Sequence, residues 1–252
     1  MNQQYNIPFS ILHLTETDST NSYLKKIGEI RPIEEFTTVL TDFQRFGHGQ
    51  EGNSWESENS KNLLFSLILY PDFCKANQQF YLSQLISLAV KDTLEQYVSD
   101  ISIKWPNDIY WKKKKICGIL IENNLYGPRI SQSIVGIGIN INQETFRSNA
   151  VNPISLYQIT GKVYDRESIL IEFLMRAKEY YNIFKDNGLD LISQRYSEAL
   201  YRKDGYHPYR DKNGEFMAKI TCILPSGTFV LTDEEGIERH YEFQEVTYLP
   251  EE

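Results

Sequence analysis

A proline turn held between two apolar strands is the feature that most constrains this chain. The turn spans Trp105-Pro106-Asn107-Asp108, and the strands are predicted at 101–104 and 116–121. Pro106 lacks a backbone N–H and forces the residue before it out of the helical region, so the turn is extended and stiff. Lys115 directly precedes the second strand. A rigid polar turn beside one lysine on a buried strand indicates a site that handles negative charge.

The lysine run at 112–115 also has an ordinary interpretation. Charged residues between two strands usually form the solvated turn of a β-hairpin. We accept this interpretation for residues 112–114, whereas we assign Lys115 to the site because of the strand that follows it.

Composition narrows the class of protein. A chain of 252 residues with 41% hydrophobic content can bury a core, as one large domain or a large domain with a small partner. The net charge of -8 would repel a polyanion, so nucleic-acid binding is not expected as the main task. Cys74, Cys117 and Cys222 form no paired pattern, which predicts buried free thiols in a reducing cytoplasm.

No segment predicts export or membrane insertion. The first 14 residues lack a basic region followed by an apolar core, and no stretch reaches the ~18 uncharged apolar residues that a transmembrane helix needs. We therefore expect a cytoplasmic protein with no membrane partner.

Periodicity and capping residues predict alternating helices and strands. Asp18 or Ser19 is expected to cap a short helix that Gly28 ends in a left-handed conformation. Strands are predicted at 37–43, 63–69 and 134–141, an amphipathic helix at 77–98, and further helices at 165–188 and 189–201. The stretch from 142 to 163 is predicted to be irregular.

The last part of the chain changes character. From about Tyr206, short strand-like runs at 216–223, 228–231 and 239–248 are separated by turn sequences. This pattern predicts a small β-barrel.

A glycine motif at 47–52 matches the G-x-G-x-x-G pattern of dinucleotide-binding folds. Such a turn must open a helix whose N-terminal amides meet a pyrophosphate. Here residues 53–60 are loop-like and lead into a strand. The motif therefore favours a flexible loop whose backbone can approach a ligand closely, with a plain surface loop as the alternative.

Four motifs in the same order resemble those of the biotin protein ligases. They are S-T-N at 19–21, K-W-P-N-D at 104–108, K-x-x-G-I-L-x-E at 115–122 and G-x-G-I-N-x-N at 136–142. The resemblance implies an α+β catalytic domain at 1–203, with a mixed sheet flanked by helices as in class II aminoacyl-tRNA synthetases. It implies an SH3-like β-barrel at 204–252.

The resemblance also implies a reaction and its site residues. A biotin ligase uses ATP to make biotinyl-5'-AMP and transfers the biotinyl group to a lysine of a biotin carboxyl carrier domain, as in acetyl-CoA carboxylase. The implied biotin-binding residues are Ser19, Thr20, Asn21, Gln44, Gly47, His48, Lys115 and Gly118. The implied adenylate-binding residues are Gly49, Gln50, Gly52, Trp55, Asn107, Lys115, Gly136, Gly138, Ile139 and Asn140. Tight packing would explain the glycines equally well.

This sequence departs from the family in the glycine loop. The usual loop is G-R-G-R-x-G, whereas this chain has His48 and Gln50 at the arginine positions. Glutamine offers neutral donors and histidine is only partly charged near neutrality, unlike arginine. We hypothesise that Arg45, together with Lys115, supplies part of the missing positive charge.

Joining biotin to an amine requires activation of its carboxylate. Lys115 is expected to bridge the biotin carboxylate and the α-phosphate as negative charge moves between them. Asp108 is expected to orient the incoming lysine or to receive its proton, although a purely structural role in the turn is an equal alternative. Mg²⁺ is expected on the triphosphate, held mainly by phosphate and water with Asn107 as a weak ligand.

Other functions stay open. A lipoate ligase shares the adenylate chemistry, and a catalytically silent biotin- or nucleotide-binding module is a second alternative. Only eighteen residues precede Ser19, too few for a helix-turn-helix domain, so we expect a monofunctional enzyme without DNA binding. A homodimer stays open, because one sequence does not fix the oligomeric state.

Overall fold

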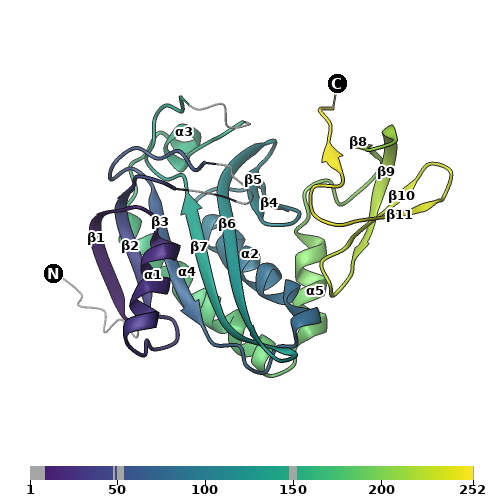
Figure 1. Ribbon diagram of the computed structural model, residues 1–252. Helices are drawn as coiled ribbons and strands as arrows, with labels where there is room; N and C mark the ends of the chain where they lie inside the picture. The colour runs from purple at the N-terminus through teal and green to yellow at the C-terminus, as the bar shows by residue number, and fades with distance from the viewer. Residues whose placement is uncertain (1–8, 48, 50–53, 148–151, 252) are drawn as a thin grey trace.

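The computed structural model describes residues 9–47, 49, 54–147 and 152–251, and its centre is a seven-stranded sheet (Figure 1). The strands β1 and β2 pair in parallel and the other neighbours are antiparallel, which makes the sheet mixed. In spatial order the strands are β1 (Ile11–Thr17), β2 (Thr38–Gln44), β3 (Leu63–Leu69), β7 (Arg129–Ile139), β6 (Lys114–Tyr126), β5 (Asp108–Trp111) and β4 (Ile101–Lys104).

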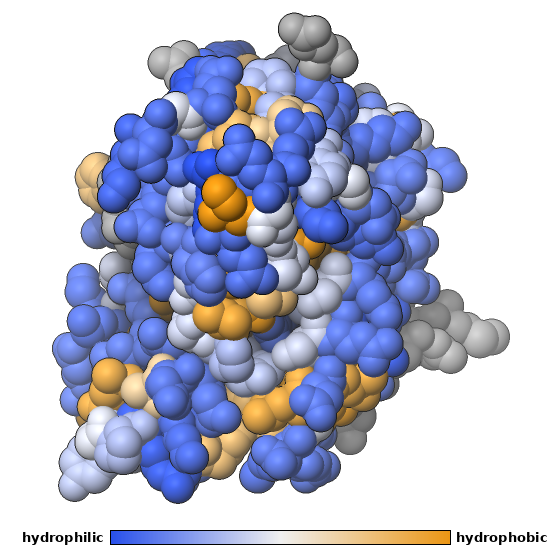
Figure 2. All heavy atoms as spheres, turned by 90° about the vertical axis from the view of Figure 1, so that its right-hand side faces the viewer, coloured by the Kyte–Doolittle hydropathy of each residue, from blue (hydrophilic) through white to orange (hydrophobic). Residues whose placement is uncertain are grey.

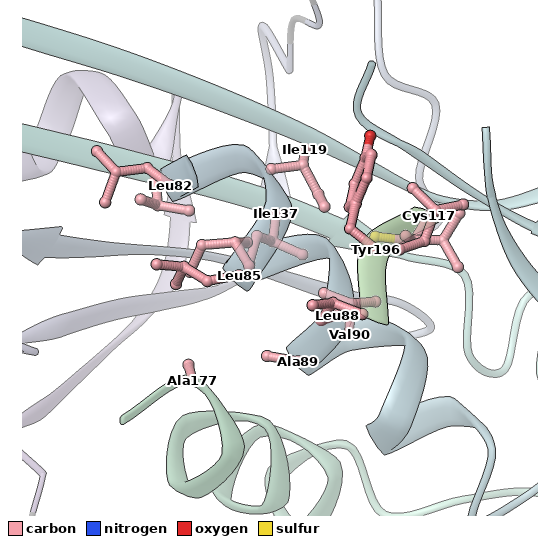
Figure 3. Packing of buried hydrophobic residues seen from close by; sticks show 14 of the residues in the cluster. Leu82, Leu85, Leu88, Ala89, Val90, Cys117, Ile119, Ile137, Ala177 and Tyr196 are labelled. Carbon is pink, nitrogen blue, oxygen red and sulfur yellow. The ribbon is translucent and has the colours of Figure 1, made fainter. Parts of the chain in front are cut away.

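Helices cover both faces of this sheet (Figure 1). On one face, α1 (Thr20–Ile30) packs on β2, β3 and β7. On the other face, α2 (Phe80–Leu94) packs on β4 and β5 and is in turn covered by α4 (Arg166–Lys185) and α5 (Leu189–Glu198). The larger core lies on this second face, where leucines of α2 meet Ile119 of β6 and Ile137 of β7 (Figure 3).

Burial explains why the central strands form where they do. All seven residues of β3 are buried, as expected for an apolar strand covered by helices on both faces. Asp165 caps α4 by accepting from the backbone N–H groups of Glu167 and Ser168. The strongest sequence signals therefore coincide with the elements that carry the core.

A second, five-stranded antiparallel sheet follows α5. Its strands in spatial order are β11 (Glu238–Tyr241), β10 (Phe229–Asp233), β9 (Gly214–Ile223), β8 (His207–Asp211) and β12 (Thr247–Tyr248). Trp105 of the proline turn stacks on Phe229 with ring centroids 4.8 Å apart, and its Nε1 donates to the Gly227 carbonyl over 3.0 Å. The second sheet is thus packed directly against the turn that joins β4 to β5 at one edge of the first sheet.

The surface is mainly polar on the side of the second sheet. Figure 2 shows this side, where hydrophilic residues cover most of the surface and apolar residues gather in separate patches. Among the described residues, no helix is both long and apolar enough to cross a bilayer.

The predicted fold class is confirmed, with a mixed sheet, flanking helices and a second antiparallel sheet. The strands predicted at 63–69 and 101–104 have the predicted bounds. The structure adds the strands β1, β5 and β8. It also adds the short helix α3 (Leu156–Thr160), which lies inside the stretch expected to be irregular. The helix predicted at 77–98 is shorter at both ends, because the 3₁₀ turn η1 (Ala76–Gln78) precedes α2 and α2 ends at Leu94.

The structure corrects the sequence analysis at the end of α1, at Cys222, and at 239–248, where β11 and β12 stand in place of one strand. Gly28 does not end α1, which continues to Ile30 and stops at an extended Arg31. The helix tolerates a glycine in its last turn because packing of the preceding residues, such as Leu24 in the core, decides its length. Cys222 is exposed, whereas Cys74 and Cys117 are buried as expected.

Phe173 gives a direct test of the core. It is fully buried on α4 and meets Phe65 of β3 edge to face, with centroids 5.2 Å apart. Phe173→Ala should lower the free energy of unfolding by about 3–5 kcal/mol, because it leaves a cavity that the rigid core cannot fill. Met175→Ala, on the exposed side of the same helix, should change it by less than about 0.5 kcal/mol. Urea unfolding followed by circular dichroism measures both values, and equal losses would contradict this account of the core.

Glu251 makes stability depend on acidity. It accepts from Lys113 over 2.8 Å and from His207 over 2.7 Å and lies 3.2 Å from Arg202, contacts that hold the pKa of its carboxyl below the usual 4.5. A carboxyl with a lowered pKa stabilises the fold above its unfolded pKa, and this contribution is lost as pH falls through the folded pKa. The stability difference between the native chain and Glu251→Gln should therefore be constant from neutral pH down to about 5 and shrink below that. Thermal unfolding across this range measures it, and a difference that grows in acid is the contrary outcome.

Candidate functional site

One cavity of about 620 Å³ gathers most of the predicted site residues. Its volume is in the usual range for small-molecule sites, roughly 300–1,000 Å³. Its lining comes from the start of α1, the end of β2, the proline turn, β6, β7 and the segment 243–248 of the second sheet. Predicted residues in the lining are Ser19, Thr20, Asn21, Gln44, Gly49, Trp55, Asn107, Asp108, Lys115, Gly118, Gly136, Gly138 and Asn140.

Lys115 and Asp108 form an ion pair in this cavity. Lys115 Nζ lies 2.6 Å from Asp108 Oδ1, with the two side chains 31% and 24% exposed. The backbone of Lys115 is fixed as well, because its N–H donates to the Asn152 carbonyl and its carbonyl accepts from Ile154. The cavity therefore holds a positioned ammonium group whose partner in this structure is a carboxylate.

A β-bulge explains how Lys115 reaches the cavity. Lys115 and Gly118 are three residues apart, whereas side chains on one face of a regular strand are separated by two. The pairing of β5 with β6 shifts register between Ile109 and Tyr110, so that Tyr110 pairs with Lys115 and Ile109 with Cys117. The extra residue re-aims the side chain. Consequently Lys115 Nζ lies 3.4 Å from the Cβ position that Gly118 lacks.

Asn107 fastens the proline turn to β6. Its Nδ2 donates to the Ile119 carbonyl, and its own carbonyl accepts from the Ile119 N–H over 3.2 Å. Tyr196 of α5 donates to the Pro106 carbonyl over 3.2 Å. These bonds hold the turn, and with it Asp108, on the scaffold of the sheet.

Trp55 lies on two glycines that face each other across β6 and β7. Gly118 and Gly138 are register partners, and a Cβ on them would meet Trp55 ring carbons at 2.9 Å and 2.5 Å. Lys115 Nζ lies 5.7 Å from the centroid of the Trp55 ring system. The glycines are therefore needed for the close approach of a flat ring to the sheet.

Three polar atoms of residues in the cavity wall are buried without a hydrogen-bond partner among the described residues. They are Nε1 of Trp55, a donor, Oδ1 of Asn140, an acceptor, and the Tyr248 hydroxyl, which can do either. Leaving buried polar groups unpaired costs about 1–3 kcal/mol each. A ligand with both donors and acceptors, such as a nucleobase, would satisfy them.

Some predicted residues lie elsewhere. Ile139 is fully buried in the core and is absent from the lining, because it alternates with the cavity-facing Gly138 along β7. Gly136, expected near the nucleotide, lines the cavity but faces Asn21, whose Oδ1 would be 2.3 Å from an added Cβ. Gly47 is buried beside the lining, where its carbonyl accepts from the Trp55 N–H over 2.8 Å. His48, Gln50 and Gly52 lie outside the described residues.

Arg45, which was hypothesised to supply positive charge to the site, does not line the cavity in this structure. Its guanidinium pairs with Asp18 over 2.8 Å and with Glu16 over 3.3 Å, and it is not part of the lining. These two ion pairs hold the Arg45 guanidinium outside the lining.

The structure adds Lys104 and Tyr248 to the site. Lys104 Nζ lies 3.2 Å from the Tyr110 hydroxyl and 4.8 Å from the centre of the Tyr248 ring. Burial lowers the pKa of Lys104, and the charge of Asp108 offsets part of that effect. Lys104 belongs to the K-W-P-N-D motif and could have been noticed, whereas no local pattern indicates that Tyr248 returns to the cavity.

Comparisons with known proteins agree with this arrangement. The family model described as "Biotin/lipoate A/B protein ligase family" matches residues 14–140. The bifunctional ligase/repressor BirA of Bacillus spizizenii is 30% identical over 235 residues, which are 91% of this chain and 72% of the relative. The biotin–[acetyl-CoA-carboxylase] ligase of Paracoccus denitrificans is 31% identical over 62% of this chain and 67% of its own length.

A solved structure shows the same fold. The biotin protein ligase from Aquifex aeolicus, in complex with biotin and ATP, superposes with a TM-score of 0.77 at 29% identity, covering 94% of this chain and 97% of that one. The matched motifs, the shared fold and the cavity that joins them together establish that this chain belongs to the biotin/lipoate A/B protein ligase family.

Proposed function

We propose that this chain is an ATP-dependent biotin protein ligase that makes biotinyl-5'-AMP and transfers the biotinyl group to a lysine of a carrier domain. Its relatives bear the names biotin–protein ligase and biotin–[acetyl-CoA-carboxylase] ligase. The observation that carries the proposal is the position of Lys115, whose ammonium lies in one cavity with both the Ser19-Thr20-Asn21 segment and Trp55.

The positive charges in the cavity suit the first step of this reaction. Two anions, a carboxylate and a triphosphate, must approach each other, and Lys115 and Lys104 supply positive charge in the lining. Holding two reactants in the right geometry can remove about 7–11 kcal/mol from a barrier. Lys115 then stabilises the charge that moves between the biotin carboxylate and the α-phosphate.

Asp108 first pairs with Lys115 and later acts on the acceptor lysine. Without ligands its carboxylate holds the Lys115 ammonium over 2.6 Å. An incoming phosphate attracts the same ammonium, so Asp108 is released to orient the acceptor lysine and to receive its proton in the second step.

The residues present fit a metal ion that arrives with the nucleotide. Among the described residues, no group of three or more His, Cys, Asp or Glu side chains could hold one. Magnesium keeps several waters and binds mainly through substrate phosphates, where it screens their charge. Asn107 would contribute at most one oxygen, since its Nδ2 is committed to the Ile119 carbonyl.

The adenine is assigned to the Trp55 side of the cavity and biotin to the Thr20 side. The unpaired Trp55 Nε1 and Asn140 Oδ1 suit the edge of a nucleobase. Thr20 and Gln44 offer hydroxyl and amide groups suited to a cyclic urea. The acceptor is proposed to be a biotin carboxyl carrier domain of a biotin-dependent carboxylase.

The role of Lys115 can be tested in a complete reaction. Protein, Mg-ATP, biotin and a carrier domain should give a product with the biotin mass on one lysine, detected by mass spectrometry. Lys115→Ala should slow product formation by at least about 10²–10³-fold, because a preorganised charge is lost from the transition state. Lys114→Ala removes an exposed neighbour and should retain the native rate. A native rate in Lys115→Ala would remove this residue from the mechanism.

The acyl substrate can be identified by ATP–pyrophosphate exchange. Biotin should support exchange, and lipoate at the same concentration should not, because only biotin offers the urea that Thr20 and Gln44 are arranged to bind. Exchange with lipoate alone would instead assign a lipoate ligase. Binding of biotin without any exchange would indicate a silent binding module.

A further inference from the structure

A chain of hydrogen bonds runs behind the biotin side of the cavity and crosses four elements. Asn21 Nδ2 donates to Glu122 Oε2 over 2.6 Å, and Ser66 Oγ lies 2.6 Å from both Asn21 Oδ1 and Thr20 Oγ1. Gln44 Oε1 accepts from the Thr20 backbone N–H over 2.8 Å. We call these five residues the Glu122–Gln44 chain. Only Thr20, Asn21 and Gln44 of its members line the cavity.

The chemistry of the groups fixes the direction of each hydrogen bond. An ionised carboxylate only accepts, so Asn21 must present its NH₂ group to Glu122 and its carbonyl oxygen to Ser66. That oxygen only accepts as well, and therefore takes the single proton of the Ser66 hydroxyl. Ser66 Oγ is then left to accept from Thr20.

The same reasoning sets what Thr20 and Gln44 offer to a ligand. Thr20 Oγ1 is 2.6 Å from Ser66 Oγ and 3.2 Å from Gln44 Oε1, so its proton goes to the nearer oxygen. The Thr20 oxygen therefore presents a lone pair to the cavity. Gln44 Oε1 is occupied by the Thr20 backbone N–H, which leaves the Gln44 NH₂ group to donate.

Gly136 makes room for this chain. It is the register partner of Ser66 in the pairing of β3 with β7. A Cβ at Gly136 would lie 2.3 Å from Asn21 Oδ1, a distance that side-chain atoms do not tolerate. The absence of a side chain here lets Asn21 lie flat on the sheet between Ser66 and Glu122.

We propose that Ser66 and Glu122 are positioning residues that set the polarity of the biotin pocket. Ser66 is fully buried and acts only through its neighbours, and Glu122 lies on β6 outside the cavity lining. Together they make Thr20 Oγ1 an acceptor, beside the Gln44 amide donor that the Thr20 backbone N–H orients. A cyclic urea presents the complementary N–H and C=O side by side, whereas a dithiolane ring presents neither. The inference rests on the proposed function and extends it to residues outside the pocket.

The test distinguishes a loss of the polar contacts to the urea from general damage to the binding site. Affinity is measured by calorimetry for biotin and for a probe with the same ring sulfur and valerate chain but no urea. KM is measured separately for biotin and for ATP. Ser66→Ala should weaken biotin binding by about ten-fold or more, since the Glu122–Gln44 chain loses the buried hydrogen bonds that pass through the Ser66 hydroxyl. KM for ATP and the affinity for the urea-free probe should change by less than about two-fold, within the ordinary scatter of neutral substitutions.

Variants of Glu122 and Ser133 complete the design. Glu122→Leu removes the acceptor and should behave like Ser66→Ala, while Glu122→Gln keeps a carbonyl acceptor and should recover most of the affinity. Glu122 is an exposed position, so these variants remain informative if Ser66→Ala does not fold. Ser133→Ala is the matched control, because Ser133 is equally buried on β7 but bonds to Asn123 instead. Its affinity for biotin should match that of the native chain.

Three outcomes would overturn the inference. Ser66→Ala and Glu122→Leu could lose no more biotin affinity than Ser133→Ala, or could lose binding of ATP or of the urea-free probe to the same extent as biotin. Glu122→Gln could also fail to recover what Glu122→Leu loses. In each case the native chain still binds biotin. A native chain that neither binds biotin nor supports exchange would instead refute the proposed function itself.

Discussion

The ion pair between Lys115 and Asp108 is the contact on which the site depends. It joins β6 to the end of the proline turn across 2.6 Å and is only partly open to solvent. Both partners are fixed through their backbones, Lys115 by segment 152–154 and Asp108 by the pairing of β4, β5 and β6. A compact ammonium held in this way loses little freedom when it exchanges a carboxylate for a phosphate, which is the physical advantage of a preorganised charge.

Missing side chains shape the cavity as much as those present. Gly118 and Gly138 create the flat floor under Trp55, and Gly136 creates the space for Asn21. All three lie at the centre of a sheet, where glycine weakens a strand and is found where another group approaches closely. The strand β3, which pairs with β7, is buried along its whole length and contributes apolar side chains to the core.

The sequence predicted best what local patterns control. The apolar run at 63–69 was predicted with the correct bounds because both faces of this strand are buried. The edge strand β1 has no fully buried residue, so its sequence gave little periodic signal. Motif residues such as Lys115 and Asp108 were placed in one cavity correctly. The position of Tyr248 could not be predicted, because it depends on how the second sheet packs on Trp105. The ion pairs of Arg45 with Glu16 and Asp18 could not be predicted either, because the pairing of β1 with β2 brings these residues together.

Packing of the second sheet on the proline turn gives that turn support from three directions. Phe229 stacks on Trp105, Tyr196 of α5 bonds to Pro106, and Ile119 of β6 bonds to Asn107. Each contact reaches a different residue of the turn, so a shift of any one element is resisted by the other two. The residue that follows, Asp108, inherits this rigidity, and Lys115 takes its position from Asp108. Lys115 and Asp108 are therefore supported by both sheets, so the cavity depends on contacts between residues far apart in the chain.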